Sequence, residues 1–434
     1  MRKAKDKDTG EVRAIKTISR DKIKNYKRFI NEVNVLKTLD HPNIIKLFEV
    51  YEDKTDVHLV TEYWSGGELF DHLLRTKKIN EKETAKLFRQ IVYSVIYCHK
   101  NAICHRDLKP ENFMFESDKP DANLKLIDFG LSCSYFKFKK NGNGGFHRMK
   151  SIVGTAYFIA PEVIGEDYTK ACDMWSIGVI LYIMLSGFPP FDGKNESEII
   201  EAVKRKEVFF NEEIWGDISK NAQDLISKLL VPEEERILPK DVLKHPWLQN
   251  LDELPNIDSN LLNSEHIQRL KKFQNMQSFK KLIITFIATR TTDIEVYSQM
   301  QTFRQLDKNK DGYITPNELK ERLKTEMDPE EVNEILNAVD TDQNGAINYT
   351  EFIAATMDRY LYEDKKKLHK MFKLLNINGD GKLSPNDIKH LFKKDMLQLF
   401  DDEMVHNMIK QWDYDNDGFV TLDEFYQCIS FDDF

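Results

Sequence analysis

The sequence has little cysteine and no long apolar run. Its five cysteines are scattered and form no Cys-x-x-Cys pair, which favours reduced thiols in a cytosolic protein over a disulfide framework. The longest apolar stretches, such as LIITFIA from Leu282, are far shorter than the roughly 20 residues of a membrane span. No secretory signal or prenylation box is present, and Arg2 after Met1 rules out a myristoylated start on this sequence. We expect a cytoplasmic protein without a transmembrane segment, or one attached to a membrane through residues that precede Met1.

The charge of the 434 residues is distributed unevenly. Residues 293–434 hold 30 Asp and Glu against 17 Lys and Arg, whereas residues 1–292 hold 42 against 46. The length indicates two or three domains. The acidic C-terminal third argues against a nucleic-acid partner and favours a cation or a basic partner.

A twelve-residue pattern rich in Asp, Asn and Gly recurs four times in the acidic third. Its copies are DKNKDGYITPNE from Asp307, DTDQNGAINYTE from Asp340, NINGDGKLSPND from Asn376 and DYDNDGFVTLDE from Asp413. Each has oxygen-bearing side chains at positions 1, 3 and 5, glycine at 6, an apolar residue at 8 and an acid at 12. One copy alone would indicate a polar turn, but four in register predict EF-hand loops.

The spacing of this pattern follows from the needs of a hard divalent cation. Such an ion takes about six or seven oxygen ligands, and the glycine permits the sharp turn that wraps the chain around it. In the three regular loops we expect these ligands to be Asp307, Asn309, Asp311, Tyr313, Glu318, Asp340, Asp342, Asn344, Ala346, Glu351, Asp413, Asp415, Asp417, Phe419 and Glu424. The residues at position 7 in this set would contribute backbone carbonyls. The apolar residues at position 8 should pair the loops through short β-bridges: Ile314, Ile347, Leu383 and Val420.

The third loop departs from the pattern at both ends. Asn376 replaces the first aspartate, and the shorter Asp387 replaces the last glutamate. Loss of one charge and of bidentate reach predicts weak calcium binding, or Mg²⁺ binding. The expected ligands of this weaker site are Asn376, Asn378, Asp380, Lys382 and Asp387.

Three motifs in the first half indicate a different chemistry. HRDLKPEN spans residues 105–112, LKLIDFG ends at Gly130, and GTAYFIAPE ends at Glu162. In this order they predict phosphoryl transfer from ATP. Asp107 would accept the proton of a substrate hydroxyl, and Lys109 would stabilise the transferring group. Asn112 and Asp128 would hold Mg²⁺ ions.

Further residues are expected to complete the nucleotide site. Lys16, in the strand DTGEVRAIK, would contact the α- and β-phosphates and be held by Glu32. Glu62 and Glu68 flank a glycine hinge and are expected beside the nucleotide. An isolated Asp beside His and Arg is more often a surface ion pair, and a buried Asp-Phe-Gly could be a turn. Both alternatives fail because the other motifs are present, including a buried apolar helix from Asp173 and an Arg236–Glu162 pair.

Residues 1–247 resemble a eukaryotic serine/threonine kinase of the calmodulin-kinase group, and the whole chain resembles the calcium-dependent protein kinase family. The resemblance implies an α+β fold: a two-lobed kinase with an incomplete N-terminal lobe, followed by an all-α calmodulin-like domain with four EF-hands. It implies an autoinhibitory junction over 248–292 and the calmodulin-like domain over 293–434. It also implies ATP, Mg²⁺ and Ca²⁺ as cofactors, and protein substrates with basic residues near the target Ser or Thr, for which Glu68 and Glu111 occupy the matching acidic positions.

The junction contains a predicted basic amphipathic helix. Over 264–290 it carries six Lys and Arg against one Glu, with apolar residues at helical intervals: Ile267, Leu270, Phe273, Met276, Phe279, Leu282 and Phe286. A calcium-loaded EF-hand domain grips such a helix, although an ordinary helix packed on a kinase lobe would look the same. Our hypothesis is that the helix around 271–281 blocks the catalytic groove at low calcium and that calcium relocates it.

The activation segment, residues 128–162, has no acid between Gly130 and Glu162. Kinases with an arginine before the catalytic aspartate, here Arg106, usually need negative charge in this segment. Many family members have a carboxylate near the position of Ser151. We therefore expect Ser151 to be phosphorylated, with an exposed unmodified serine as the alternative.

No Gly-x-Gly-x-x-Gly precedes Lys16. In the kinase pattern that glycine-rich loop precedes the strand lysine, so this sequence begins after the loop. We therefore interpret residues 2–16 as the second strand, a turn and the third strand. A chain cut downstream of its natural start, a start codon placed too late and a short isoform would each explain it, and we favour an N-terminal truncation. The loss would weaken ATP binding. A catalytically impaired calcium sensor or scaffold is therefore the alternative to a calcium-activated kinase.

Overall fold

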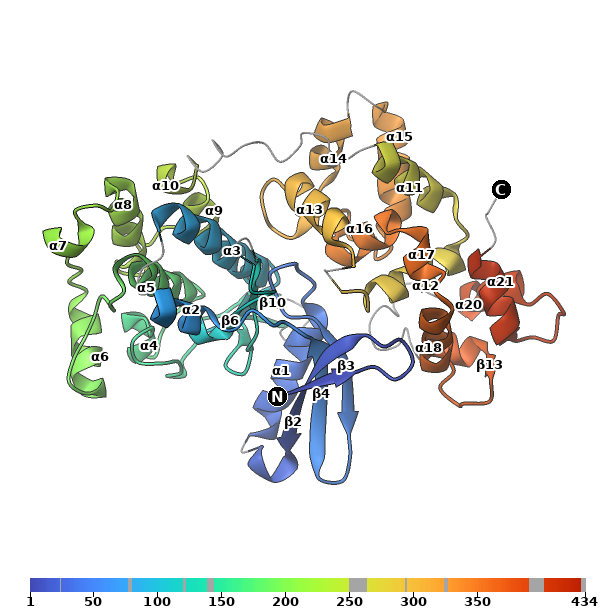
Figure 1. Cartoon of the computed structure of the whole chain (residues 1–434), viewed down its shortest axis with the longest axis horizontal. Helices are drawn as coiled ribbons and strands as arrows, with labels where there is room; N and C mark the ends of the chain where they lie inside the picture. The colour runs from blue at the N-terminus through green and yellow to red at the C-terminus, as the bar shows by residue number, and fades with distance from the viewer. Residues whose placement is uncertain are drawn as a thin grey trace. The chain divides into compact units, whose positions relative to one another are not determined.

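The computed structural model describes the chain except residues 24, 77–79, 120–121, 139–143, 250–263, 293–294, 324–326, 390–401 and 431–434. Its helices and strands fall into two compact units (Figure 1). The first unit is built mainly from Ala14–Ile257, and the second mainly from Asp258–Lys308 and Gly312–Phe434. None of the helices in the described residues is long and apolar enough to cross a membrane.

A four-stranded sheet with one covering helix opens the chain, drawn in blue in Figure 1. Its strand order is β1-β2-β4-β3, with β1 at Arg2–Lys5, β2 at Val12–Ser19, β3 at Leu47–Glu52 and β4 at Asp56–Glu62. The 3-10 helix η1 (Arg20–Lys22) leads to α1 (Tyr26–Thr38), which begins where the Asn25 side chain accepts a hydrogen bond from Arg28 N. Phe29 and Val33 of α1 pack against Val57 and Leu59 of β4. The predicted strand–turn–strand at the start of the chain is confirmed.

The rest of the first unit is mostly helical. Its helices are α2 (Leu69–Thr76), α3 (Glu81–Lys100), α4 (Pro161–Ile164), α5 (Cys172–Ser186), α6 (Glu196–Arg205), α7 (Glu212–Trp215), α8 (Lys220–Leu229), α9 (Pro239–Val242) and α10 (Pro246–Gln249). Helix α5 is buried along nearly its whole length, as its continuous apolar sequence predicts. The predicted Arg236–Glu162 pair is present: the two guanidinium nitrogens lie 2.5 and 3.1 Å from the carboxylate.

Short strand pairs carry the loops between these helices. They are β5 (Ile103–Cys104) with β8 (Cys133–Ser134), β6 (Phe113–Phe115) with β7 (Leu124–Leu126), and β9 (Phe136–Phe138) with β10 (Gly144–Phe146). The 3-10 helix η2 (Pro110–Asn112) lies between β5 and β6. The β5–β8 and β6–β7 pairs flank the segments 105–112 and 127–132, which contain most of the predicted catalytic motifs.

The second unit is helical, drawn from yellow to red in Figure 1. Its helices are α11 (Ser264–Asn275), α12 (Ser278–Ala288), α13 (Tyr297–Leu306), α14 (Pro316–Leu323), α15 (Pro329–Val339), α16 (Tyr349–Thr356), α17 (Arg359–Tyr362), α18 (Lys365–Leu375), α20 (Asp402–Trp412) and α21 (Leu422–Ser430). Each predicted loop lies between two of these helices. The loops join in pairs through β11 (Tyr313–Ile314) with β12 (Ile347–Asn348) and β13 (Lys382–Leu383) with β14 (Val420–Thr421). Ile314 faces Ile347 and Leu383 faces Val420, which confirms the predicted bridges.

The predicted single junction helix is two helices. The helix breaks at Gln277, whose backbone is not helical (φ −58°, ψ 145°). The ammonium of Lys281 donates to the carbonyl of Gln274 at 2.8 Å, which satisfies one of the carbonyls left free at the end of α11. The break places Phe279 against Trp412, with ring centroids 4.3 Å apart. No proline or glycine marks this position, so the cause is tertiary packing. The polar connection predicted at 248–263 lies mostly outside the described residues.

Candidate active site and cation-binding loops

The segment between β5 and β6 positions the three predicted catalytic side chains. Thr155 Oγ1 donates to one Asp107 carboxylate oxygen at 2.9 Å, and Lys109 Nζ lies 3.3 Å from the other. Lys109 also donates to Thr155 at 3.2 Å. Asn112 Nδ2 donates to the Asp107 backbone carbonyl at 2.7 Å, and its side chain is buried. The arrangement presents a carboxylate, an ammonium and an amide on one short loop, as a proton acceptor with charge stabilisers requires.

Lys16 on β2 is held by Glu32 on α1. Lys16 Nζ donates to Glu32 Oε1 at 3.1 Å. Burial by itself would lower the pKa of Lys16, but the carboxylates of Glu32 and Asp128 outweigh it and raise that pKa. The lysine is therefore a fixed cation beside the motif that contains Asp128, where it can meet phosphate oxygens.

Helix α1 also holds the segment that follows Asp128. Gly130 N donates to Asp128 Oδ1 at 2.9 Å, which turns the carboxylate toward its own loop. Arg28 Nε donates to the Gly130 carbonyl at 2.6 Å, and Asn31 Nδ2 donates to the Ser132 carbonyl at 2.9 Å. One helix thus fixes the expected phosphate-binding lysine and the expected magnesium-binding segment together.

A buried carboxylate beneath the catalytic loop organises its backbone. Asp173, at the start of α5, accepts from the backbone N–H groups of His105 at 2.9 Å and Arg106 at 2.8 Å, and from His99 Nε2 at 2.8 Å. Burial would raise the pKa of Asp173, but these donors and His99 keep it lowered. The contact holds Arg106 in a left-handed backbone conformation, with φ +70°.

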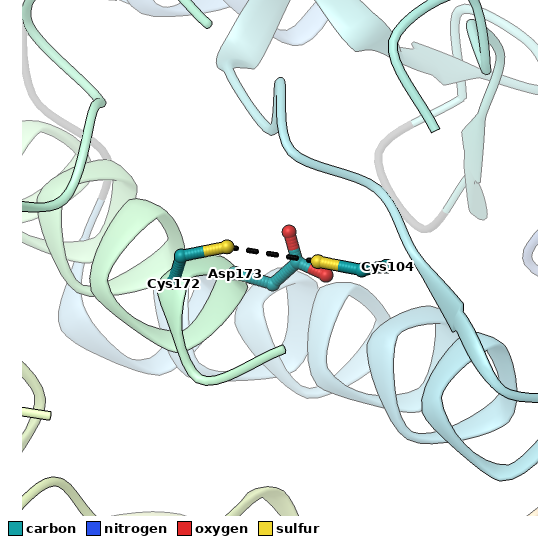
Figure 2. Close-up of side chains that lie close together, drawn as sticks. All are labelled: Cys104, Cys172 and Asp173. Atoms are coloured by element: carbon teal, nitrogen blue, oxygen red, sulfur yellow. Dashed lines mark hydrogen bonds between the residues drawn. The ribbon is translucent and has the colours of Figure 1, made fainter. Parts of the chain in front are cut away.

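Two cysteines lie against this carboxylate (Figure 2). Cys104 and Cys172 have their sulfurs 3.6 Å apart, and together with an Asp173 oxygen they lie within 4.8 Å of one another. Such a cluster could hold a metal ion, but its donors do not fit one. The oxygens of Asp173 already accept N–H donors, and burial raises the pKa of both thiols, which disfavours thiolate ligands. We interpret the cluster as packing beneath the catalytic loop.

The side chain of Glu62 faces inward instead of toward a nucleotide. It is buried, forms an ion pair with Lys125 at 2.5 Å and accepts from Trp64 Nε1 at 2.8 Å. The Lys125 ammonium also lies 4.7 Å from the centre of the Trp64 ring. The carboxylate of Glu62 is therefore not available to a nucleotide, and it holds the hinge in place through Lys125 and Trp64.

Glu68 belongs to an acidic cluster with Asp71 and Glu111. Burial raises the pKa of Glu68, and the charges of Asp71 and Glu111 raise it further. Glu111 Oε2 is buried and has no hydrogen-bond partner among the described residues. Like charges gathered around a buried, unsatisfied oxygen favour a cationic guest.

The four cation loops close in the same way. In each, the acid at position 12 accepts backbone N–H bonds from positions 2 and 9, at distances of 2.8–3.1 Å. The glycine at position 6 has φ between +83° and +88° in every loop, a conformation that side chains disfavour. The shortened Asp387 closes its loop as the three glutamates do, so the third loop differs in charge and not in backbone shape.

Carboxylates converge most closely in the second and fourth loops. Oxygens of Asp340, Asp342 and Glu351 lie within 4.8 Å of one another, and so do oxygens of the three equivalent residues of the fourth loop: Asp413, Asp415 and Glu424. Burial, together with the charge of Asp342, raises the pKa of Glu351 to about 7. In the fourth loop burial acts the same way on Glu424, but hydrogen bonds from Thr421 and Tyr414 lower its pKa.

The first and third loops carry fewer converging charges. Asp307 Oδ2 accepts from Gly312 N at 2.9 Å, and the asparagine at position 3 is neutral. In the third loop Asn376 Oδ1 accepts from Gly379 N at 3.0 Å. Lys382 of that loop forms an ion pair with Asp417, an expected ligand of the fourth loop, at 2.5 Å. This ammonium places a competing positive charge beside the fourth site.

Several residues that support the candidate active site lie outside the sequence motifs and were not predicted from them. Asp173 could have been suspected because it is a lone carboxylate at the start of a largely apolar helix. Arg28 and Lys125 give no such signal, because only the fold brings them to Gly130 and Glu62.

The residues present fit the cofactors that phosphoryl transfer uses. Lys16 offers a cation to the nucleotide phosphates, and Asn112 and Asp128 offer oxygen ligands to Mg²⁺. When bound, Mg²⁺ neutralises phosphate charge. In such a reaction Asp107 would orient the substrate hydroxyl and accept its proton, and Lys109 would stabilise the charge on the transferring group.

Comparisons with known proteins agree with this geometry. Residues 1–248 match the protein kinase domain, and residues 298–357 and 365–434 match the EF-hand domain pair. The chain is 39% identical over 433 residues to calcium-dependent protein kinase 5 of Plasmodium falciparum, covering 99% of this chain and 75% of that protein. It is 38% identical over 443 residues to calcium-dependent protein kinase 4 of Plasmodium berghei, covering 97% and 82%.

Proposed function

The chain belongs to the calcium-dependent protein kinase family and is a calcium-activated serine/threonine kinase that uses ATP, Mg²⁺ and Ca²⁺; from this premise we propose how it selects substrates and how calcium gates it. Its substrates carry a basic residue upstream of the target Ser or Thr, bound by Glu68, Asp71 and Glu111. Calcium acts by retaining α11 and α12 within the second unit.

The observation that carries the substrate proposal is the buried, unpartnered Oε2 of Glu111. Glu111 lies four residues after the catalytic Asp107. Its negative charge and that of Asp71 repel the carboxylate of Glu68. A guanidinium or ammonium group from a substrate would satisfy this oxygen and relieve the repulsion. A neutral side chain would leave it unsatisfied, which is how such a site discriminates.

Peptide kinetics test this proposal. Glu68→Gln should raise KM for a peptide with an upstream arginine by about 10-fold, the value of one charge-assisted hydrogen bond, with little change in kcat. A peptide with alanine at that place should respond far less. Glu201→Gln, an exposed carboxylate paired with Lys204 on α6, is the matched control. Equal loss for both peptides would overturn the proposal.

The gating proposal rests on the packing of α11 and α12. Their apolar residues Leu270, Phe273, Phe279 and Ile283 are at most 1% exposed and belong to the core of the second unit. The EF-hand domain therefore holds this helix pair through its apolar face, in the same way as a calmodulin-like domain holds a target helix.

Basic residues of α11 add ion pairs to this packing. Arg269 donates to Asp358 at 2.5 Å and to the Thr356 carbonyl at 2.8 Å, and Lys271 lies 2.5 Å from Glu331. Without calcium, we propose, the loops release the pair, and the basic helix inhibits the kinase.

Truncation tests the gating proposal. The cut belongs after Gln249, because Leu248 is buried and its carbonyl accepts from Arg89 at 2.7 Å. The truncated chain should phosphorylate peptide equally in calcium and in chelator, whereas the full chain should need calcium. Removal of only the residues after Phe425, which leaves α11 and α12 in place, is the comparison variant and should not give activity in chelator. A truncated kinase that still needed calcium would contradict the proposal.

A further inference from the structure

We propose that the side chain of Lys382 is a tethered competitor of calcium: its ammonium binds an expected ligand of the fourth loop and lowers the affinity of that loop for calcium. Lys382 itself belongs to the third loop. One loop therefore sets the calcium threshold of its partner through a side chain. The inference goes beyond the proposed substrate preference and helix gating, and it depends on neither.

The carboxylate of Asp417, at position 5 of the fourth loop, is engaged by groups other than a cation site. Its Oδ2 lies 2.5 Å from Lys382 Nζ, and its Oδ1 accepts a hydrogen bond from Phe419 N at 3.0 Å. Three further expected ligands of this loop have carboxylate oxygens within 4.8 Å of one another: Asp413, Asp415 and Glu424. Within the described part of the chain, Asp417 is not a member of that group. Calcium that uses this carboxylate must displace the lysine.

The bridge between the two loops holds Lys382 in this position. Lys382 in β13 pairs with Thr421 in β14, and the next residue, Leu383, pairs with Val420. Leu383 and Val420 are both buried. The ammonium also lies 5.4 Å from the centre of the Phe419 ring, which is within the range of a cation–π contact. The backbone of Lys382 is thus fixed on the third loop while its charged end lies at the fourth.

The charges around Lys382 keep its ammonium ionised. The hydrogen bond to Asp417, together with the charges of Asp417, Asp415 and Asp380, raises the pKa of Lys382. The lysine therefore brings a full positive charge to a loop that is expected to accept a doubly charged ion. Like charges repel, and the affinity of an EF-hand depends on the charge that its ligands offer. The lysine both occupies one ligand and opposes the incoming ion.

The ion pair itself contributes little to the stability of the fold. The side chains of Lys382 and Asp417 are 44% and 30% exposed, and exposed ion pairs are weak in water. Loss of the ammonium should therefore leave the calcium-free second unit about as stable as before. A purely structural role would instead predict a lower melting temperature in chelator.

The first pair of loops lacks this feature. Of the four residues at position 7, only Lys382 is charged; the others are Tyr313, Ala346 and Phe419. The second loop gathers carboxylates within the same distance as the fourth, but its partner loop has a tyrosine where the third loop has the lysine. The competition is therefore confined to the second pair of loops.

Calcium titration of the full-length chain by calorimetry tests the inference. Lys382→Met keeps the apolar stem and removes the charge, and the backbone carbonyl expected at position 7 is unchanged. We expect the calcium affinity of the fourth loop to rise about 5-fold to 10-fold. Lys382→Arg keeps the charge and should keep the wild-type affinity. Lys366→Met, which replaces an exposed lysine near the start of α18, changes the net charge equally and should leave the affinity unchanged.

A second substitution assigns the gain to the fourth loop. Glu424→Gln removes an expected ligand of that loop, so adding Lys382→Met to it should no longer raise the calcium affinity. Because salt screens an exposed charge, the difference between wild type and Lys382→Met should also shrink from about 0.05 M to about 0.5 M KCl.

Peptide phosphorylation tests the consequence for the kinase. Lys382→Met should lower the calcium concentration that gives half-maximal activity. The factor should be smaller than the gain in affinity, since the other loops also contribute to activation. If the affinity rises and this concentration does not move, the fourth loop does not set the threshold and that part of the inference is wrong.

The remaining outcomes decide the role of Lys382 directly. An unchanged calcium affinity in Lys382→Met, or a gain that persists beside Glu424→Gln, would overturn the inference. An unchanged affinity with a lower melting temperature in chelator would assign Lys382 a structural role instead. Failure of the Glu68→Gln or truncation experiments would contradict the proposed function and leave this inference standing.

Discussion

Asp107 and Glu351 are both carboxylates at functional sites, but the protein surrounds them differently. Asp107 is held by donors, Thr155 and Lys109, at 2.9 and 3.3 Å. Glu351 is held by backbone N–H groups but lies against other carboxylates, and its pKa is raised to about 7. Asp107 is thus held by donors of the protein itself, whereas Glu351 lies among negative charges that a bound cation would offset. The difference predicts opposite responses to removing a carboxylate.

The largest effect should follow loss of the catalytic base. Asp107→Asn removes the proton acceptor but keeps the hydrogen bond to Thr155, so the loop should stay folded. We expect kcat to fall about 10³-fold, with calcium binding unchanged, as measured by peptide phosphorylation and calorimetry. A kcat within 10-fold of wild type would show that another group accepts the proton.

Loss of the buried organiser should cost stability as well as activity. Asp173→Asn removes a charged acceptor from His99, His105 and Arg106. We expect the unfolding transition of the first unit to lose about 2–4 kcal/mol, together with kcat. Asp167→Asn, an exposed carboxylate with 60% of its side chain accessible, is the control and should change stability by less than about 0.5 kcal/mol. Equal effects in the two variants would remove Asp173 as the organiser of the catalytic loop.

The second cation loop should respond with the opposite sign. Because the pKa of Glu351 is raised from 4.5 to about 7, the fold loses stability as the pH rises through this range, and the full cost is present above about pH 7. Glu351→Gln should therefore stabilise the calcium-free second unit by about 1 kcal/mol at pH 8 while lowering the calcium affinity of the second loop more than about 10-fold.

The fourth loop is the matched control for this prediction. Hydrogen bonds lower the pKa of Glu424, so its ionised form stabilises the fold. Glu424→Gln should destabilise the calcium-free unit and lower calcium affinity as well. Thermal unfolding in chelator measures the two signs. If both substitutions shift the melting temperature in the same direction, the electrostatic distinction between the loops is wrong.

The sequence predicts this architecture well wherever function requires a fixed spacing. The EF-hand register, the catalytic motif order and the Lys16–Glu32 and Arg236–Glu162 pairs could all be read from it, because cation and phosphate geometry fixes which residue types stand where. The break at Gln277, the inward side chain of Glu62 and the opposite shifts of Glu351 and Glu424 could not. Each depends on what another part of the fold buries against it, and neither local pattern nor composition records that.

The smallest expected effect concerns the third loop. Its sequence lacks one charge and a long acidic side chain, whereas its backbone closes as in the other loops. Asp387 accepts hydrogen bonds from Ile377 N and Ser384 N, as the glutamates do in their loops. A substitution in this loop therefore does not have to change its backbone conformation. Asp387→Glu adds bidentate reach and should raise calcium affinity about 3-fold to 10-fold, with little change in the calcium-free stability. Asn376→Asp in addition should raise it further, since it restores the missing charge. Titration of calcium against the single and double variants measures both steps. If Asp387→Glu alone raised the calcium affinity of the third loop to that of the fourth, the third loop would lack side-chain reach and not charge.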